Sequence, residues 1–487
     1  MKLLLDTNIL IPLEPTSVSN VEPNTELAAK LVNSALHVGA KLFIHPIQYQ
    51  DLARDPDPQR QALRSVLISK YLELKNPPAI SATLESVIGR AVRGSNDEID
   101  NQLLAAVAAN SVSYLVTEDI ALLKKATKAN LSERVLPLKE ALQVLESLYE
   151  KTSTPPPAVD SIPAYLLNLD DAIWESFRGD YPGFDQWFKK KVQEEHRPCW
   201  IINGGNGYAG VAIIKPEPDF GLLPGRVYKL CSFKVSASHS GLKYGELLLK
   251  TVFSYANENN LDWLYVTVFD KQVQLVELFK SFGFQELAHR SAAGELILAK
   301  PLHPSASGEQ LEGLAFNIRF GPSHLDLNQT SYAIPIKPQY HDILFPELLD
   351  QLPLIPGEHP SGNSLRKAYL SRSTITPPAP GSVIAFYRSE DKSAITCIGV
   401  VEQTLRSQNP DEIAAFVGTR TVYTYDEIVD MCAHDAVLAI LFRQARPLIP
   451  PARLEELQAN GVLLGPPQSI TQLKGEAKTW LKLRLQS

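Results

Sequence analysis

Residues 2–11 read KLLLDTNILI, an apolar run interrupted by a carboxylate and an amide, Asp6 and Asn8. A second apolar run, SYLVT at residues 113–117, ends at Glu118 and Asp119. Two strands that each end in an acid predict a parallel sheet that brings carboxylates to one edge.

Two further acids lie between these runs in helix-like surroundings. Asp51 lies in PIQYQDL, residues 46–52, and Asp100 lies in DEIDNQLLAA, residues 97–106. Four carboxylates that converge cannot all stay ionised unless a divalent cation neutralises them. Taken singly, each acid also has an ordinary structural role, such as capping of the following helix by Asp119.

The order strand acid, helix acid, helix acid, strand acid resembles that of the PIN-domain nucleases over residues 1–150. The resemblance implies a parallel α/β sheet and a site where Mg²⁺ or Mn²⁺ activates a water for attack on a phosphodiester. It assigns catalytic and metal-binding roles to Asp6, Asp51, Asp100 and Asp119, with Asn8 and Thr117 as hydrogen-bonding supports. The family usually has Glu at the second position, so the role of Asp51, or of Gln50 in its place, stays open.

The whole chain has the composition of a globular protein. Its 487 residues, 44% hydrophobic and 21% charged, predict about three domains. No apolar run is long enough to span a membrane, and four scattered cysteines favour a reducing cytoplasm. The net charge of −7 means that any nucleic-acid contact requires local basic patches.

Composition breaks divide the chain into three segments. A proline-rich linker is predicted at residues 151–163, because a Pro triplet stiffens the chain into an extended spacer. A second linker is predicted at residues 303–312. The expected domains are therefore 1–150, 164–302 and 313–487.

The middle segment alternates strands, turns and helices. A glycine-rich turn predicts a hairpin from residues 200–214, and a strand at 227–235 leads through a polar loop into an amphipathic helix. Backbone amides at such a helix start can bind a pyrophosphate.

The order of these elements resembles the GNAT-type N-acetyltransferases over residues 160–300. The resemblance implies a mixed sheet with helices that binds acetyl-CoA. The positions that it assigns to the cofactor are Phe233, Val235, Ser240, Gly241, Lys243, Tyr244 and Gly245.

The middle segment departs from the family at three positions. Ser240 replaces an Arg or Gln, Lys243 replaces the first glycine of the loop, and Phe279 replaces the usual general-acid Tyr. Phe cannot protonate a departing thiolate. Tyr265, Ser232 or a water would have to substitute for it. Without such a group, the domain either binds acetyl-CoA and reacts slowly or serves only as a scaffold.

The C-terminal segment resembles the small β-barrel of the PUA and ASCH superfamily, on a Pro-Gly entry at residues 380–381 and two following apolar strands. The resemblance implies RNA binding. Basic and aromatic side chains suited to phosphate contact and base stacking are Arg366, Lys367, Arg372, Arg388, Arg406, Arg420, Tyr369, Tyr387 and Tyr423. The alternative is that these are solvated surface residues whose rings reach the core.

Together these features predict an α/β and α+β multidomain protein. The leading hypothesis is a cytoplasmic, toxin-like effector that cleaves RNA, with tRNA as the favoured substrate, and that carries an acetyl-CoA-binding domain. The alternatives are a regulatory or antitoxin-like nucleic-acid-binding protein with a structural GNAT domain, and a protein N-acetyltransferase with recruiting domains. A partner protein or a homo-oligomer stays open. The union of the three activities rests on fold-level analogy.

Overall fold

The computed structural model describes residues 1–13, 24–149, 157–349 and 359–486. The chain forms two compact units. Unit 1 contains residues 1–151, 407–419 and 423–436, and unit 2 contains residues 152–406, 420–422 and 437–487. Residues 151–156 of the predicted first linker lie outside the described residues, and the division into three domains stays a prediction.

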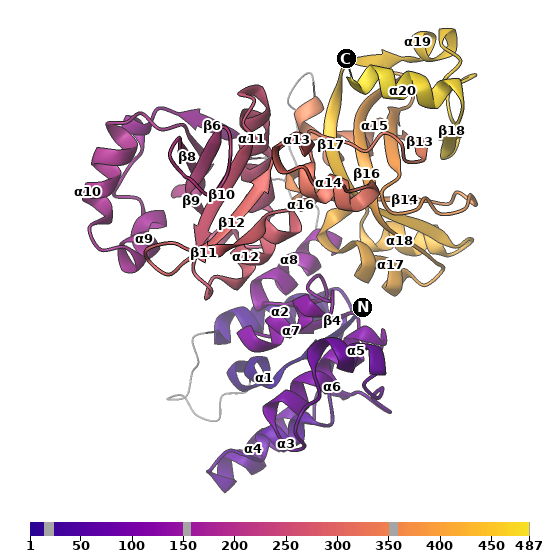
Figure 1. Cartoon of the computed structure of the whole chain (residues 1–487). Coiled ribbons are helices and arrows are strands. Elements are labelled where there is room, and N and C mark those ends of the chain that lie inside the picture. The colour runs from indigo at the N-terminus through magenta and orange to yellow at the C-terminus, as the bar shows by residue number, and fades with distance from the viewer. Residues whose placement is uncertain (14–23, 150–156, 350–358, 487) are drawn as a thin grey trace. The chain divides into compact units, whose positions relative to one another are not determined.

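A parallel five-stranded sheet forms the centre of unit 1 (Figure 1). In spatial order its strands are β3 (Leu72–Glu73), β2 (Lys41–Ile44), β1 (Lys2–Leu5), β4 (Tyr114–Val116) and β5 (Val135–Leu136). β1 pairs with β2 on one side and with β4 on the other, so the strand order reverses at β1. In such sheets ligands bind at the carboxyl ends of the strands beside the reversal, where Asp6 follows β1. The predicted parallel sheet is confirmed.

Helices bury this sheet, and Leu3, Leu4 and Leu5 are at most 1% exposed, as expected for a parallel strand covered on both faces. The described helices of residues 1–149 are α1 (Thr7–Leu13), α2 (Thr25–His37), α3 (Gln48–Leu52), α4 (Pro58–Ile68), α5 (Ala82–Ile88), α6 (Asn96–Ala108), α7 (Ile120–Lys128) and α8 (Leu138–Tyr149). Ser95 begins α6 by accepting a hydrogen bond from the amide of Glu98, a standard N-terminal cap.

Two helices from the C-terminal segment also belong to unit 1, namely α17 (Pro410–Val417) and α18 (Tyr425–Cys432). The hydroxyl of Tyr114 donates to the carbonyl oxygen of Ala414 over 3.2 Å, and the rings of Tyr149 and Tyr425 lie 5.2 Å apart. Two helices of the expected C-terminal domain therefore pack as part of unit 1.

A seven-stranded sheet forms the first half of unit 2. Its spatial order is β11 (Gln285–Arg290), β12 (Leu296–Pro301), β10 (Trp263–Val268), β9 (Val227–Val235), β8 (Gly207–Pro216), β7 (Cys199–Gly204) and β6 (Val159–Ile162). β9 and β10 run parallel, and the other neighbours run antiparallel. The predicted hairpin is the β7–β8 pair, whereas β6 falls within the stretch predicted as a linker.

Separate apolar layers cover the two faces of this sheet. One contains α11 (Tyr244–Glu258) and α12 (Val273–Ser281), and the other contains α9 (Glu175–Asp180) and α10 (Phe184–Phe188). The aromatic cluster around the fully buried Trp174 fills the second layer.

A mixed six-stranded sheet forms the second half of unit 2. Its order is β14 (Arg366–Ser371), β17 (Val437–Arg453), β16 (Ala394–Ser407), β15 (Val383–Arg388), β13 (Ser331–Ile336) and β18 (Thr471–Leu473). The remaining α-helices of unit 2 are α13 (Pro304–Ser307), α14 (Gly313–Phe320), α15 (Pro338–Leu344), α16 (Pro360–Asn363), α19 (Leu454–Ala459) and α20 (Glu476–Gln486). Pairing in the described residues does not close this sheet on itself, so the expected small β-barrel is not confirmed.

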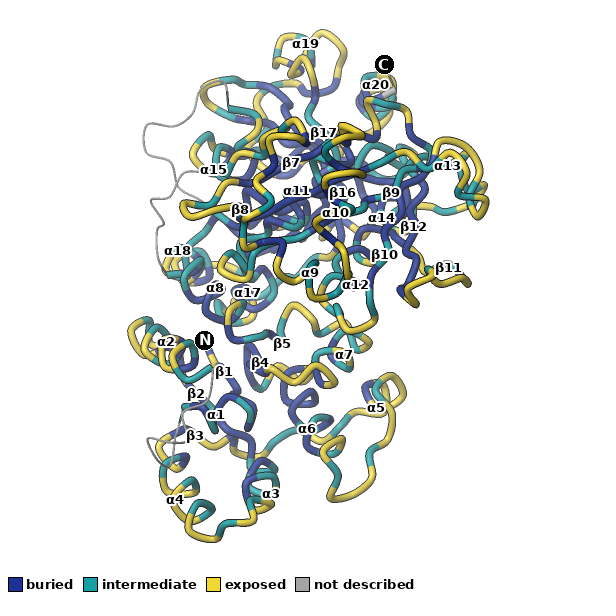
Figure 2. The backbone as a smooth tube through the Cα atoms, turned by 90° about the vertical axis from the view of Figure 1, so that its left-hand side faces the viewer, coloured by how far each residue is buried: buried dark blue, intermediate teal, exposed yellow. Residues whose placement is uncertain are grey.

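Burial follows these layers. Figure 2 shows the central strands of the sheets as buried, whereas α4 and α5 have exposed faces. In the part of the chain that the structure describes, none of the helices has the length and apolar character needed to cross a membrane.

Candidate functional site

The parallel strands β9 and β10 separate partway along their length. Their pairing runs from Val227 opposite Trp263 to Leu230 opposite Val266. Beyond Leu230, β9 continues to pair with β8 on its other edge. The register between β8 and β9 shifts between Ile213 and Ile214, which leaves Cys231 as the extra residue of a β-bulge. An extended ligand can add to the strand edge that β10 leaves open.

Ser232 lies at this separation. It is 1% exposed, and its Oγ has no hydrogen-bond partner among the described residues. Native proteins seldom leave a buried hydroxyl unpaired, and ligand sites are a common exception. The next residue, Phe233, packs its ring 5.3 Å from the ring of Phe279, so the backbone rather than the side chain of Phe233 is available to a cofactor.

The loop that follows β9 places the predicted cofactor residues together at the start of α11. Ser240 and Gly241 precede Lys243, which adopts a left-handed conformation with φ +61° at the N-cap. A non-glycine residue accepts this conformation only at a cost, which explains why a glycine is expected here. The first intrahelical bond runs from Leu247 N to Lys243 O, so the preceding amides of the first turn point out of the helix.

Gly245 has a packing reason to lack a side chain. A Cβ atom at this position would lie 3.0 Å from Cδ2 of Leu278 on α12. The missing side chain lets α12 lie close to the start of α11. Tyr244 is buried, and its ring stacks on His239 with centroids 5.5 Å apart.

Phe279 is fully buried between the rings of Phe233 and Phe284, so this position supplies no proton. Of the two proposed substitutes, Tyr265 donates its hydroxyl to Glu217 Oε2 over 2.5 Å, and burial together with this carboxylate raises the pKa of Tyr265. Tyr265 also lies in the paired part of β10, opposite Lys229. Of the two, only Ser232 lies beyond Leu230, the last residue of β9 that pairs with β10.

A polar cluster beside Tyr265 was not evident from the sequence. Glu295 is 4% exposed and accepts hydrogen bonds from Tyr181 Oη at 2.5 Å and Ser291 Oγ at 2.8 Å. Burial lowers the pKa of Lys229, against the opposing effect of Glu295. Each of these residues resembles an ordinary strand or turn residue, so only the fold brings them together.

The first turn of α11 is also bound to the C-terminal half of unit 2. The carboxylate of Glu246 accepts hydrogen bonds from Ser364 Oγ at 2.6 Å, Leu365 N at 2.8 Å and Arg366 N at 3.1 Å. Asn363 Nδ2 donates to the carbonyl oxygen of Leu242 over 2.9 Å. These bonds hold the loop in position from outside its own domain.

In unit 1, Asp6 lies at the centre of a hydrogen-bond network. Its oxygens accept from Thr7 N at 2.7 Å, Asn8 Nδ2 at 2.9 Å and Thr117 Oγ1 at 2.6 Å. Burial raises the pKa of Asp6 to about 6, with smaller contributions from the charges of Asp100 and Asp119. Asn8 and Thr117 therefore hydrogen-bond to Asp6, and their role in a catalytic site stays a prediction.

The other predicted acids have partners of their own. Asp100 Oδ2 accepts from Lys125 Nζ at 2.9 Å, and Asp119 Oδ1 accepts from the amides of Ala121 and Leu122 as the cap of α7. Asp51 Oδ1 accepts from Arg54 Nη1 at 3.2 Å. The structure thus brings Asp6, Asp100 and Asp119 within electrostatic reach of one another, whereas Asp51 is engaged with Arg54.

These acids do not fit a metal centre as they lie here. In the described ranges, no three His, Cys, Asp or Glu side chains are placed to hold a metal ion. Lys125 provides part of the positive charge that a cation would supply, since it pairs with both Asp97 and Asp100. The sequence did not single out this lysine.

Several of the C-terminal residues predicted to contact RNA are buried or paired inside unit 2. Lys367 and Tyr387 are fully buried, and Arg388 is 6% exposed and paired with Asp342 and Asp391. Arg366 pairs with Glu402. Lys367 lies next to Arg366, and Tyr387 lies next to Arg388, so each pair points to opposite faces of the sheet, and neither face leaves these side chains open to solvent. The interpretation of Lys367, Tyr387 and Arg388 as surface contacts is therefore wrong, whereas RNA binding by this segment stays a prediction.

The separation of β9 and β10 lies beside the start of α11, so an open strand edge and the amides of a helix start, both able to bind a ligand, lie close together in this α+β domain. Residues 164–284 match the family model described as Acetyltransferase (GNAT) family, so this part of unit 2 is a GNAT acetyltransferase domain. No curated protein matches the chain at a significant level.

Several solved structures are similar to parts of the chain. ASCH from Zymomonas mobilis is 17% identical, with 31% of this chain and 94% of that chain covered and a TM-score of 0.25. A putative acetyltransferase of the GNAT family from Desulfovibrio desulfuricans is 17% identical, with 30% and 98% covered and a TM-score of 0.24. A GNAT family acetyltransferase from Elizabethkingia anophelis with acetyl-CoA bound is 12% identical, with 31% and 100% covered and a TM-score of 0.23.

Proposed function

We propose that the chain is an acetyl-CoA-dependent N-acetyltransferase whose donor site lies where β9 separates from β10. The observation that carries this proposal is the open edge of β9 after Leu230, directly followed by a helix start with outward amides. A bound acetyl-CoA supplies the thioester that donates the acetyl group.

The chain's own groups divide the task of holding this ligand. Amides in the first turn of α11, which follows the cationic residue Lys243 at its N-cap, suit a pyrophosphate. The open edge of β9 at residues 232–235 suits an extended amide chain. The hydroxyl of Ser232 is the protein group best placed to give a proton to the departing thiolate.

The acceptor is an amine in this proposal, and its class is tested by coupled thiol detection. The full chain is incubated with acetyl-CoA and, in separate reactions, with a lysine-containing peptide, a polyamine and aminoacyl-tRNA. Release of free CoA thiol with one class identifies the acceptor. If no class gives release above the rate without acceptor, the transferase proposal is overturned.

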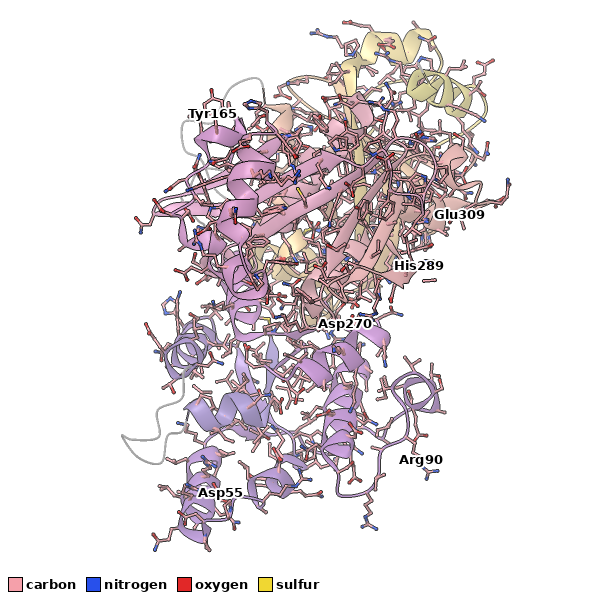
Figure 3. All side chains as sticks on the ribbon, turned by 60° about the vertical axis from the view of Figure 1, so that its left-hand side comes forward. Asp55, Arg90, Tyr165, Asp270, His289 and Glu309 are labelled. Atoms are coloured by element: carbon pink, nitrogen blue, oxygen red, sulfur yellow. The ribbon has the colours of Figure 1, made fainter. Side chains whose placement is uncertain are left out.

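A second candidate function belongs to unit 1, because Asp6 and Asp119 follow the central strands β1 and β4, and Asp100 of α6 lies within electrostatic reach of Asp6. We propose that this edge acts on RNA, with tRNA as the first substrate to test. Basic side chains lie nearby in sequence: Arg90 and Arg93 precede α6, and Arg90 is 90% exposed (Figure 3).

The experiment is incubation of the purified chain with total tRNA, with and without Mn²⁺, and with Asp6→Asn and Asp119→Asn as variants. Cleavage that disappears in both variants supports the second function. Equal cleavage by the wild type and both variants assigns the activity to a contaminant and overturns it, as does the absence of cleavage by the wild type.

A further inference from the structure

A Ser, a His and an Asp form a continuous hydrogen-bond chain in unit 2, away from the separation of β9 and β10. Ser305 Oγ lies 2.8 Å from His303 Nδ1, and His303 Nε2 lies 2.6 Å from Asp262 Oδ1. Ser305 is exposed, and the side chains of His303 and Asp262 are each 28% exposed. The serine therefore faces solvent, and the acid lies behind the imidazole.

The direction of these bonds follows from the chemistry of the groups. The other oxygen of Asp262, Oδ2, accepts a hydrogen bond from Arg226 N at 2.6 Å. Burial works to raise the pKa of Asp262, but this bond and the one from His303 outweigh it and lower the pKa. An ionised carboxylate only accepts, so His303 donates from Nε2, and its Nδ1 lone pair is left to accept the proton of Ser305.

The backbone holds the three residues in place. Leu302 N donates to the carbonyl oxygen of Asp262 over 2.9 Å, which fixes the chain just before His303 beside the chain just before β10. After α13, Glu309 (Figure 3) pairs with Arg319 of α14 over 2.8 Å. The serine thus lies on a segment that is tied down at both ends.

A cavity of about 640 Å³ opens beside this triad and is lined by all three of its residues. Phe253, Leu261 and Phe320 give it an apolar wall. His324 lines it as well, and the buried Nδ1 of His324 has no hydrogen-bond partner among the described residues. This volume is in the range of small-molecule sites, which are mostly apolar with a few convergent polar groups.

We propose that Ser305, His303 and Asp262 form a further catalytic site, which hydrolyses a carboxylic ester with an apolar acyl or alcohol part. Ser305 Oγ bonds to the ester carbonyl carbon as its proton passes to His303 Nδ1. The carbon–oxygen bond to the alcohol then breaks, and His303 returns the proton to the departing oxygen. Water, deprotonated by the same nitrogen, releases the acid from Ser305, so that ester and water give acid and alcohol.

The test is labelling of the full chain with a fluorophosphonate probe, followed by peptide mass spectrometry. Phosphonylation of Ser305 is expected, with loss of the label in Ser305→Ala and a rate lower by about 100-fold in His303→Gln, since general bases contribute that much. Ser307→Ala, on the same helix, is the matched control and should label as the wild type does.

Hydrolysis of p-nitrophenyl butyrate is the second readout, and it should fall in parallel with labelling in the same variants. Thermal melting of each variant separates loss of chemistry from loss of folding. Absence of label on Ser305 in the folded wild type overturns the proposal, and so does an unchanged labelling rate in folded His303→Gln. The test is independent of acetyl transfer, because neither reagent contains coenzyme A.

Discussion

Glu246, in the first turn of α11, accepts a hydrogen bond of 2.6 Å from the hydroxyl of Ser364, although the two residues are 118 positions apart in the chain. The same carboxylate accepts from the amides of Leu365 and Arg366. A helix start that is proposed to hold a pyrophosphate is thereby positioned by the C-terminal half of the unit.

Replacement of Ser364 by Ala should therefore weaken acetyl-CoA binding as well as stability. Loss of one bond to a buried carboxylate costs about 1–3 kcal/mol, and a cost of that size felt in full at the loop raises Kd by about 5-fold to 150-fold. Ser254→Ala is the control, because Ser254 is an exposed residue of the same helix. Calorimetric titration with acetyl-CoA measures the effect, and equal Kd values for the two variants would contradict the positioning role.

Replacement of Lys243 by Gly should stabilise the fold and weaken binding at low salt. Glycine relieves a left-handed conformation that costs about 1 kcal/mol for other residues, whereas removal of the ammonium group takes away an attraction for phosphate. The unfolding midpoint in urea reports the first effect, and Kd at two salt concentrations reports the second. A Kd that is unchanged at both salt concentrations would show that Lys243 does not contact the phosphates.

Replacement of Ser232 by Ala should lower kcat and leave the affinity for acetyl-CoA nearly unchanged. We expect a loss of about 100-fold, in the range of general acid catalysis. The hydroxyl makes no hydrogen bond with the described residues, so the free energy of unfolding should not fall by more than a few tenths of a kcal/mol. If kcat of Ser232→Ala equals that of the wild type, Ser232 is not the proton donor, and Tyr265 or a water is. The kcat of Tyr265→Phe then distinguishes these two.

The pH dependence of stability should reveal the buried carboxyl of Asp6. Its pKa rises from 3.8 to about 6 in the folded state, so the folded state binds more protons than the unfolded state between these values. This difference in pKa adds up to about 3 kcal/mol to the free energy of unfolding. The added stability is present below about pH 4 and is lost as the pH rises through 6.

Asp6→Asn should remove the pH-dependent stability that Asp6 contributes. The measurement is the difference in the free energy of unfolding between wild type and variant, from urea unfolding curves between pH 4 and 7. His45 acts in the opposite direction, because burial lowers its pKa to about 4, and it is present in both proteins. The difference therefore isolates Asp6. A difference that does not vary with pH would contradict the raised pKa.

The parts of this fold that follow from local pattern were predictable. The apolar runs before Asp6 and Asp119 and the helix-like sequence of residues 97–106 require no distant information. They place both strand ends and α6 correctly. The glycine-rich turn before β8 likewise predicts the β7–β8 hairpin.

The parts that depend on distant partners were not predictable. The pairing of β6 with β7 and the transfer of α17 and α18 to unit 1 join segments whose local sequences give no sign of each other. Arg388 and Lys367 were interpreted as surface groups because a charged residue usually lies there, whereas Arg388 is paired with acids and Lys367 donates to the carbonyl oxygens of Ser361 and Gly362.

Calorimetric titration of the full chain with acetyl-CoA is the most direct measurement of the central claim, that β9 and the start of α11 form a cofactor site. The predicted result is saturable, one-to-one binding of acetyl-CoA. Free CoA should compete with this binding, and acetate should not. A titration without binding heat, together with an unchanged melting temperature in excess acetyl-CoA, would contradict it.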